Sequence, residues 1–316
     1  MATSQNISVD LGNGIHLVDT GFQRPQMAAC YIVEDAGQVA IVETGTKDTV
    51  PLICEALDEL SLTREQVEYV IVTHVHLDHA GGAGRLMELL PNAKLVVHEK
   101  GARHMIDPSK LQAGATAVYG KAEFDKTYGD LVPISQNRIL VPNHEERLNL
   151  GERVLMFLDT PGHANHHFCV FDSLSQGFFT GDTFGLAYQE LVSSLGPFIF
   201  PTTTPVQFNP EALKSSIRTL LSYQPTCMYL THYGKVNDVE RLGKKLLGQV
   251  DELVAIALSV KDHESRLQIL HEKIMEWLMG QLEQWELDLS TKDIENAIRS
   301  DAFLNAQGLD VWLSKL

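Results

Sequence analysis

The 316-residue chain lacks the features that mark membrane, secreted or nucleic-acid-binding proteins. No segment approaches the roughly 20 consecutive apolar residues that a membrane-spanning helix needs, and the first ten residues lack the basic and apolar regions of a secretory signal. Basic residues are also few, because 25 Lys and Arg stand against 41 Asp and Glu, a formal charge of −16. Such a charge repels a phosphate backbone, and the densest basic spot, Lys244-Lys245, is short. We therefore expect no membrane and no nucleic-acid partner.

Cysteine is scarce, and the four cysteines lie far apart without any Cys-X-X-Cys pair: Cys30, Cys54, Cys169 and Cys227. This spacing favours neither a disulfide framework nor a cysteine-based metal site, so we expect a cytoplasmic protein. With 44% hydrophobic and 21% charged residues, the composition is that of an ordinary globular protein. A chain of this length can bury a sizeable core in one large or two smaller domains.

Hydrophobic periodicity divides the chain into two regions. Up to about residue 235, short apolar runs typical of strands alternate with segments of helical periodicity, whereas turn signals become sparse afterwards and three or so amphipathic helices are predicted. We therefore predict two domains, residues 1–235 and residues 236–316. Strands are expected at 28–33, 38–42, 69–73, 94–97, 153–158, 168–171, 177–180 and 227–230, helices at 50–60, 85–90, 99–106 and 211–221, and irregular structure at 113–142.

Histidine is abundant, and seven of the 13 histidines fall in three short motifs. The first motif follows a predicted buried strand and reads Thr-His-Val-His-Leu-Asp-His. His74 and His76 are two residues apart, so in extended backbone both side chains project to one side, and Asp78 and His79 follow at once. Four potential ligands within six residues can hold two cations a few ångströms apart. Imidazole and carboxylate together suit Zn²⁺, Fe²⁺ or Mn²⁺.

Further candidate ligands also follow predicted strands. His163 ends a Thr-Pro-Gly-His turn, Asp182 lies in Thr-Gly-Asp-Thr, and His232 lies in Leu-Thr-His-Tyr-Gly. Each motif is weak alone, but strand ends can meet at one rim of a sheet sandwich, so together they predict one site. His166 and His167 lie close by in sequence and are interpreted as pocket residues rather than ligands.

In chain order these residues resemble the motif set of the metallo-β-lactamase-fold hydrolases, over about residues 7–234. Within this superfamily, the chain resembles the branch of glyoxalase II-like hydrolases. The resemblance implies an α/β fold: an αββα sandwich of two mixed β-sheets flanked by helices, here followed by a C-terminal α-helical extension. It also implies two divalent metal ions, zinc first, with iron or manganese as alternatives. By this resemblance metal 1 binds His74, His76 and His163, metal 2 binds Asp78, His79 and His232, and Asp182 bridges them.

One position departs from the family pattern. The family usually has Asp in a strand-end Asp-X-Gly, where its carboxylate orients a metal ligand, and this chain has Glu43. Glu is one methylene longer, yet it could still accept a hydrogen bond from a ligand histidine or a backbone amide. We therefore expect altered metal affinity rather than loss of the metal site.

The resemblance implies a hydrolase in which a metal-bridging hydroxide attacks an ester-like bond of a small molecule. Catalytic roles fall to Asp78, which could orient the nucleophile or take its proton, and to the bridging Asp182. Tyr188 or Tyr233 could donate to the developing oxyanion, although packing is the favoured interpretation of both. The sequence favours none of the three candidate target bonds, thioester, lactone and phosphodiester, over the others.

Several alternatives remain beside this hypothesis. Asp182 argues against a true β-lactamase, the absence of a following flavodoxin domain argues against a flavodiiron protein, and the −16 charge argues against a ribonuclease. A mono-iron sulfur dioxygenase shares the first motif, and a non-catalytic metal-containing sensor or effector would retain the same ligands. The three tryptophans of the last region, Trp277, Trp285 and Trp312, could form a homodimer face or pack in the core.

Overall fold

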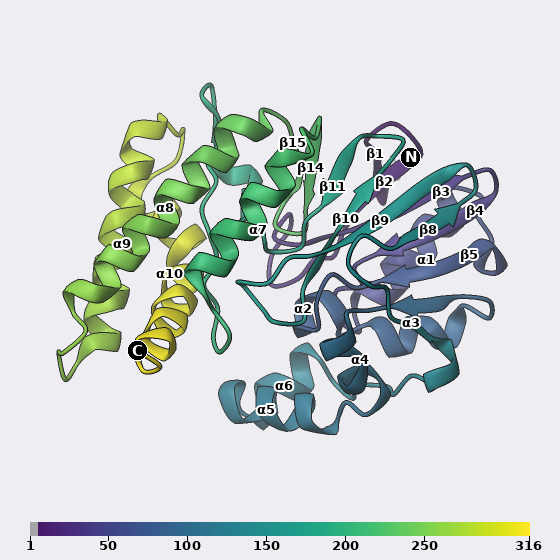
Figure 1. Ribbon diagram of the computed structural model, residues 1–316, viewed down its shortest axis with the longest axis horizontal. Coiled ribbons are helices and arrows are strands. Elements are labelled where there is room, and N and C mark those ends of the chain that lie inside the picture. The colour runs from purple at the N-terminus through teal and green to yellow at the C-terminus, as the bar shows by residue number, and fades with distance from the viewer. Residues whose placement is uncertain (1–5) are drawn as a thin grey trace, which may run out of the picture. The chain divides into compact units, whose positions relative to one another are not determined.

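The computed structural model describes residues 6–316, which fall into two compact units (Figure 1). Unit 1 comprises Met1–Asp159 and His166–Gly181, and unit 2 comprises Thr160–Asn165 and Asp182–Leu316. The predicted domain boundary after residue 235 stays a prediction.

A seven-stranded sheet dominates unit 1, and its strands are neighbours in chain order, β1 to β7. The strands are β1 (Ser8–Asp10), β2 (Ile15–Asp19), β3 (Ala29–Asp35), β4 (Gln38–Val42), β5 (Val67–Ile71), β6 (Lys94–Val96) and β7 (Ile139–Leu140). Pairing is antiparallel from β1 to β4 and parallel from β4 to β7. The predicted hairpin of β3 and β4 turns at Ala36 and Gly37, both with positive φ, as a tight two-residue hairpin turn requires.

The helices of unit 1 connect these strands and share one apolar core with the sheet. They are α1 (Thr49–Glu59), the 3-10 turn η1 (Arg64–Gln66), α2 (Leu77–Ala80), α3 (Ala83–Leu89), α4 (Glu99–Ile106), α5 (Ser109–Tyr119), α6 (Lys121–Thr127) and η2 (Gln136–Arg138). Ile53 and Leu57, one turn apart on α1, join Ile41, Val70 and Leu95 of the strands in this core. The β-branched residues Val67, Val70 and Ile71 of β5 are buried, whereas Glu68 and Tyr69 are half-buried.

A second sheet contributes four antiparallel strands to unit 1, in the order β11 (Gly177–Phe179), β10 (Phe168–Asp172), β9 (Arg153–Asp159) and β8 (Arg147–Leu150). The two sheets pack face to face, since the ring of Tyr31 in β3 lies edge-on to Phe179 in β11 with centroids 5.2 Å apart. Arg153 and Asp172 form a fully buried ion pair at 3.0 Å at the opposite end of this sheet from the His-rich motifs of the sequence. The pair joins the first residue of β9 to the last residue of β10, and each charge is compensated by the other.

One expectation about unit 1 was wrong. The stretch 113–142 was expected to be irregular, but its first half forms the end of α5 and all of α6. Gly120, with φ of +81°, is both the C-terminal cap of α5 and the N-terminal cap of α6, so one residue separates the two helices. Glycine and threonine in α5 lower its helix propensity, which hides the helix from local pattern analysis.

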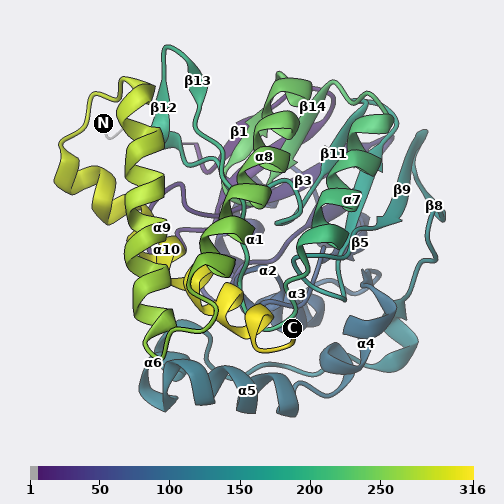
Figure 2. The same cartoon turned by 60° about the vertical axis from the view of Figure 1, so that its left-hand side comes forward.

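Unit 2 is built mainly of helices. It contains η3 (Gln189–Leu191), a small hairpin of β12 (Val192–Ser193) and β13 (Gly196–Pro197), α7 (Pro210–Ser222), a hairpin of β14 (Cys227–Leu230) and β15 (Gly234–Val236), α8 (Val239–Ser259), α9 (Arg266–Leu282), η4 (Glu283–Trp285) and α10 (Thr291–Leu313). The predicted C-terminal helices are confirmed as α8, α9 and α10, which pack side by side (Figures 1 and 2). On α9, Leu270, Ile274, Leu278 and Leu282 repeat every four residues and are buried.

Two tryptophans of unit 2 pack within the unit. Trp285 lies edge-on to Phe198 with ring centroids 5.5 Å apart, and Trp312 lies edge-on to Phe208 at 6.5 Å. These contacts support the core-packing interpretation for both residues, and a homodimer stays a prediction. Among the described residues, no helix combines the length and apolar character that crossing a bilayer requires.

Candidate metal centre

Unit 1 gathers the first histidine motif between the end of β5 and the start of α2. His74 and His79 are fully buried, and His76 is half-buried at the N-terminal boundary of α2. His74 Nε2 faces His76 Nδ1 at 2.9 Å, and the ring of His74 lies 4.0 Å from that of His79, centroid to centroid. Asp78 Oδ2 lies 3.6 Å from His79 Nε2. The strand-turn-helix geometry therefore brings all four predicted ligands of this motif together.

Glu43 determines which nitrogen two of these histidines present. It follows β4, is 1% exposed, and its Oε1 lies 3.2 Å from His79 Nδ1. The Thr73 hydroxyl donates to the same Oε1, so His74 Nδ1–H is the donor in the 3.1 Å contact with Thr73 Oγ1. Both assignments leave the lone pair on Nε2. Thr73 N also donates to Oε2 at 3.4 Å, which confirms that Glu43 can accept a hydrogen bond from a backbone amide.

Unit 2 gathers the other predicted ligands around one carboxylate. Asp182 follows the Gly181 turn, and His232 follows β14. His163 Nε2 lies 3.4 Å from Asp182 Oδ2, and His232 Nε2 lies 3.6 Å from Asp182 Oδ1. All three side chains are buried. One carboxylate oxygen thus faces each imidazole, the arrangement that a bridging carboxylate needs.

The donor set and its spacing fit divalent transition metal ions. Donor atoms on one tetrahedral zinc ion, each about 2.1 Å from it, lie about 3.4 Å from one another. The neighbouring donor pairs within each unit lie 2.9 to 3.6 Å apart. Taken unit by unit, the predicted ligands therefore have the donor types and the spacing of transition-metal ligands: His74, His76, Asp78 and His79 in unit 1, and His163, Asp182 and His232 in unit 2.

The histidines interpreted as pocket residues lie against the ligand histidines of unit 1. The ring of His167 stacks on His74 at 4.8 Å, and that of His166 lies edge-on to His76 at 5.7 Å. Both are buried, and Val75 N donates to His166 Nδ1 at 3.5 Å. His166 and His167 therefore lie beside the predicted ligands His74 and His76, as expected for pocket residues.

Two contacts of site residues were not foreseen. Thr73 links Glu43 to His74, a role that its place before the first ligand histidine could have suggested. Tyr188, weighed as an oxyanion donor, donates its hydroxyl to Asp301 of α10 at 3.2 Å and is 1% exposed. This contact supports the packing interpretation of Tyr188.

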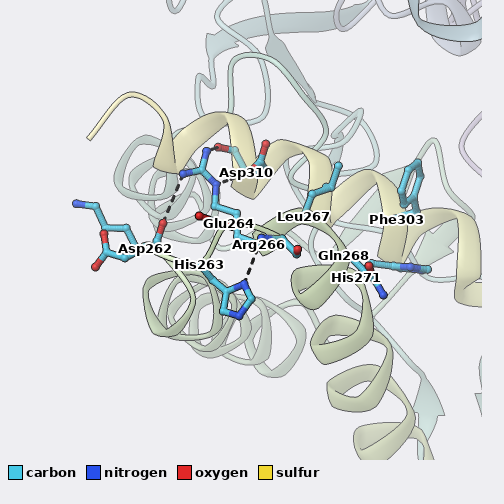
Figure 3. A pocket seen from close by; sticks show the side chains of 11 residues that line it. Asp262, His263, Glu264, Arg266, Leu267, Gln268, His271, Phe303 and Asp310 are labelled. Atoms are coloured by element: carbon cyan, nitrogen blue, oxygen red, sulfur yellow. Dashed lines mark hydrogen bonds and ion pairs between the residues drawn. The ribbon is translucent and has the colours of Figure 1, made fainter.

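A pocket of about 830 Å³ in unit 2 is unrelated to these residues (Figure 3). It lies between the loop after α8, the start of α9 and one side of α10, and none of the seven predicted ligands is among the described residues that line it. Its central cation, Arg266, is engaged by Asp310 and Ser314, and His271 packs edge-on against Phe303. Because Arg266 is already neutralised by Asp310, it offers little attraction to an anionic ligand.

Comparisons with known proteins agree with this description. The model of the family described as the Metallo-beta-lactamase superfamily matches residues 23–232. The chain is 25% identical over 229 residues to the metallo-beta-lactamase fold-containing protein ST1585 of Sulfurisphaera tokodaii, covering 71% of this chain and 80% of that protein. It is 24% identical to hydroxyacylglutathione hydrolase of Francisella tularensis subsp. novicida, over 48% of this chain and 46% of that enzyme.

Solved structures extend the likeness to nearly the whole chain. The metallo-beta-lactamase family protein TTHA1429 of Thermus thermophilus superposes with a TM-score of 0.68 and 20% identity, covering 97% of this chain and 95% of that one. At this identity the likeness concerns the fold alone. The predicted fold class, two mixed sheets with helices and C-terminal helices beyond them, is confirmed.

Proposed function

Because this chain belongs to the metallo-beta-lactamase superfamily, we propose that it is a metal-dependent hydrolase acting on an ester-like bond of a small molecule. The proposed bonds are a thioester, a lactone or a phosphodiester. The proposed metal ligands are His74, His76 and His163 for one ion, Asp78, His79 and His232 for the other, and Asp182 between them.

The placement of Asp182 carries the proposal. Its two carboxylate oxygens face two different imidazoles, His163 and His232, at 3.4 and 3.6 Å. A carboxylate that served only to orient one histidine would need one such contact. Sharing its oxygens between two histidines suits a residue that joins two cations and so supports a two-metal hydrolase over a mono-iron enzyme.

Two divalent ions held by these residues would lower the pKa of water and polarise the oxygen of the scissile carbonyl or phosphoryl group. Asp78 has the exposure to meet substrate, because 24% of its side chain is accessible whereas His79 beside it is buried. We assign it to orienting the attacking nucleophile and taking its proton. Glu43 and Thr73 hold the ring orientation of His74 and His79.

The chemistry of the donors favours zinc, since imidazole nitrogen and carboxylate oxygen are common zinc ligands, with iron and manganese as alternatives. The relative named hydroxyacylglutathione hydrolase supports a thioester among the three bond types, although this chain matches under half of that enzyme. A reducing, cytoplasmic location is part of the proposal, because all four cysteines are buried free thiols.

A substrate panel tests this function. Purified protein reconstituted separately with Zn²⁺, Mn²⁺ and Fe²⁺ is assayed on acyl thioesters, N-acyl lactones and phosphodiesters, alongside Asp182→Asn and the surface control Asp288→Asn. We expect turnover of one bond class, loss of about 100-fold or more in kcat for Asp182→Asn, and wild-type turnover for Asp288→Asn, whose side chain is exposed.

Other outcomes point to the alternative functions. Oxygen consumption with a persulfide substrate and one iron per chain would replace the hydrolase by a sulfur dioxygenase. Metal binding without turnover of any panel member, together with tight binding of one of them, would replace it by a sensor.

A further inference from the structure

A second cavity, of about 780 Å³, lies in unit 2 between α8, α9 and the hairpin of β12 and β13. We call it the α8–α9 cavity. Gly248 of α8 and Gly280 of α9 both line it, and a Cβ added to either would meet nothing within 4 Å. Larger side chains at these two positions would fill the space, so the paired glycines leave room between the helices.

The lining side chains repeat along one face of α8. Lys245, Gln249 and Glu252 are four and three residues apart, a spacing that puts them on one face of the helix. Trp277 of α9 and Trp285 of η4 supply two indole walls. Aromatic walls with a few polar groups between them are the usual lining of a small-molecule site.

Gln249 presents a buried acceptor that has no partner among the described residues. The residue is 2% exposed, and its Nε2 donates both protons, to the Ile199 carbonyl and to Gln281 Oε1, each at 3.0 Å. These two bonds determine the orientation of the amide and leave Oε1 without a hydrogen bond. A buried acceptor without a hydrogen bond is unfavourable, and a donor on a ligand in this cavity would supply the missing partner.

Lys245 lies beside this acceptor, one helical turn away. Its Nζ is 3.9 Å from the ring centroid of Trp285 and 4.4 Å from that of Phe198, so the amine is enclosed by two aromatic faces. Burial, assisted by the charge of Arg241 and opposed by that of Glu252, lowers the pKa of Lys245 to about 8. A lysine in such a setting carries a usable fraction of neutral, nucleophilic amine near neutral pH.

We propose that the α8–α9 cavity is a second small-molecule site, which takes a planar aromatic aldehyde or ketone bearing a hydrogen-bond donor and holds it as a Schiff base on Lys245. The aromatic ring of the ligand lies against the indole of Trp277, and its donor group satisfies Gln249 Oε1. The carbonyl carbon then lies within reach of Nζ, because both groups project from the same face of α8.

The covalent step needs no co-reactant. The lone pair of neutral Nζ forms a C–N bond to the carbonyl carbon, and the carbonyl oxygen leaves as water with the two amine protons, so a C=N bond replaces C=O without oxidation or reduction. Water regenerates the amine by the reverse step, so occupancy of Lys245 is reversible.

Reductive trapping tests the proposal. The full-length protein is incubated at pH 7.4 with 3-hydroxybenzaldehyde and sodium cyanoborohydride, which reduces the imine to a stable amine, and labelled lysines are identified by peptide mass spectrometry. The neighbouring Lys244 is an internal control, since it is exposed and paired with Glu240. We expect Lys245 to be labelled about tenfold or more faster than Lys244, because the lowered pKa of Lys245 leaves a usable fraction of neutral amine at this pH, whereas Lys244 is held in an ion pair with Glu240.

Two further measurements separate a built site from a merely reactive amine. For each lysine of the wild-type protein, we take the ratio of the labelling rate with 3-hydroxybenzaldehyde to the labelling rate with benzaldehyde. This ratio should be higher at Lys245 than at Lys244. The excess should disappear in Gln249→Met, which removes the acceptor and keeps the side-chain length, while labelling by benzaldehyde continues.

The pH profile gives an independent criterion. Labelling of Lys245 should be half-maximal near pH 8. The charged groups that line the cavity or act on this amine are Arg241, Lys244 and Glu252 of α8 and Glu276 of α9. Labelling of Lys245 no faster than that of Lys244, a half-maximum above pH 10, or equal hydroxyl dependence at both lysines would each overturn the proposal.

Discussion

Glu43 shows how one buried side chain can orient two histidines of the candidate metal centre. Its carboxylate faces His79 Nδ1 directly and reaches His74 through the Thr73 hydroxyl. The consequence is that two imidazoles are oriented by one buried charge. Glu43 adopts a positive φ of 64°, which is uncommon for a residue other than glycine.

Replacing that charge should weaken metal binding before it affects folding. In Glu43→Gln the shape is kept, but the amide is a weaker acceptor for His79 Nδ1–H, so we expect zinc affinity to fall about 10- to 100-fold. Titration against a competing chromophoric chelator measures it, with the exposed Glu152→Gln as control. Equal zinc affinity in Glu43→Gln and Glu152→Gln would show that the carboxylate does not orient the ligand.

Gly181 is a second residue on which the site depends. It has a φ of 47°, and a Cβ there would lie 2.4 Å from Thr73 Oγ1 and 2.6 Å from His167 Nε2. Gly181→Ala should lower the free energy of unfolding by about 2–4 kcal/mol, since backbone strain and overpacking each cost about 1–3 kcal/mol. Denaturant unfolding provides the measurement.

Gly114 provides the matched comparison for Gly181. It lies in α5, where an added Cβ meets nothing within 4 Å. Gly114→Ala should raise stability by about 0.5–1 kcal/mol through helix propensity. If both alanine variants unfold at the same denaturant concentration, the close approach at Gly181 is not a constraint.

At the scale of elements, local pattern predicted most strands and helices. The β3–β4 hairpin, α1, α4, α7 and the C-terminal helices appear where periodicity indicated them. The failure lies at α5 and α6, where glycine and β-branched residues in α5 interrupt the helical pattern. The sequence motifs also indicated the ligands. The contacts that link Glu43, Thr73 and His74 could not be predicted in this way, because Glu43 and Thr73 are 30 residues apart and meet only through the pairing of β4 with β5.

Helix α7 offers a direct test of local determinants. Asn209 caps its N-terminus by accepting a hydrogen bond from Ala212 N at 3.1 Å, and Pro210 occupies the first turn. Asn209→Ala should lower the unfolding free energy by about 1 kcal/mol. Asp48→Ala, at the start of α1, is the comparison, because Asp48 makes no capping hydrogen bond. A similar loss in both variants would remove capping as the cause.

At the scale of the whole molecule, metal should contribute to stability. Protein purified without chelator should contain about two metal ions per chain by elemental analysis. Stripping them should lower the unfolding free energy by about 2.7–4.1 kcal/mol for ions present at 100 to 1,000 times their Kd. Thermal unfolding before and after chelation, followed by zinc addition, measures this. If the purified protein contains no metal and zinc addition leaves its melting temperature unchanged, the proposal of a dinuclear site is wrong.

The strand order of the seven-stranded sheet has a consequence for synthesis on the ribosome. Every strand from β2 to β7 pairs with the strand that precedes it along the chain. Each strand of this sheet pairs with its neighbour in sequence, and the longest connection, from Val96 of β6 to Ile139 of β7, contains α4, α5 and α6. The sheet can therefore grow one edge strand at a time as the nascent chain emerges, N-terminal hairpins first.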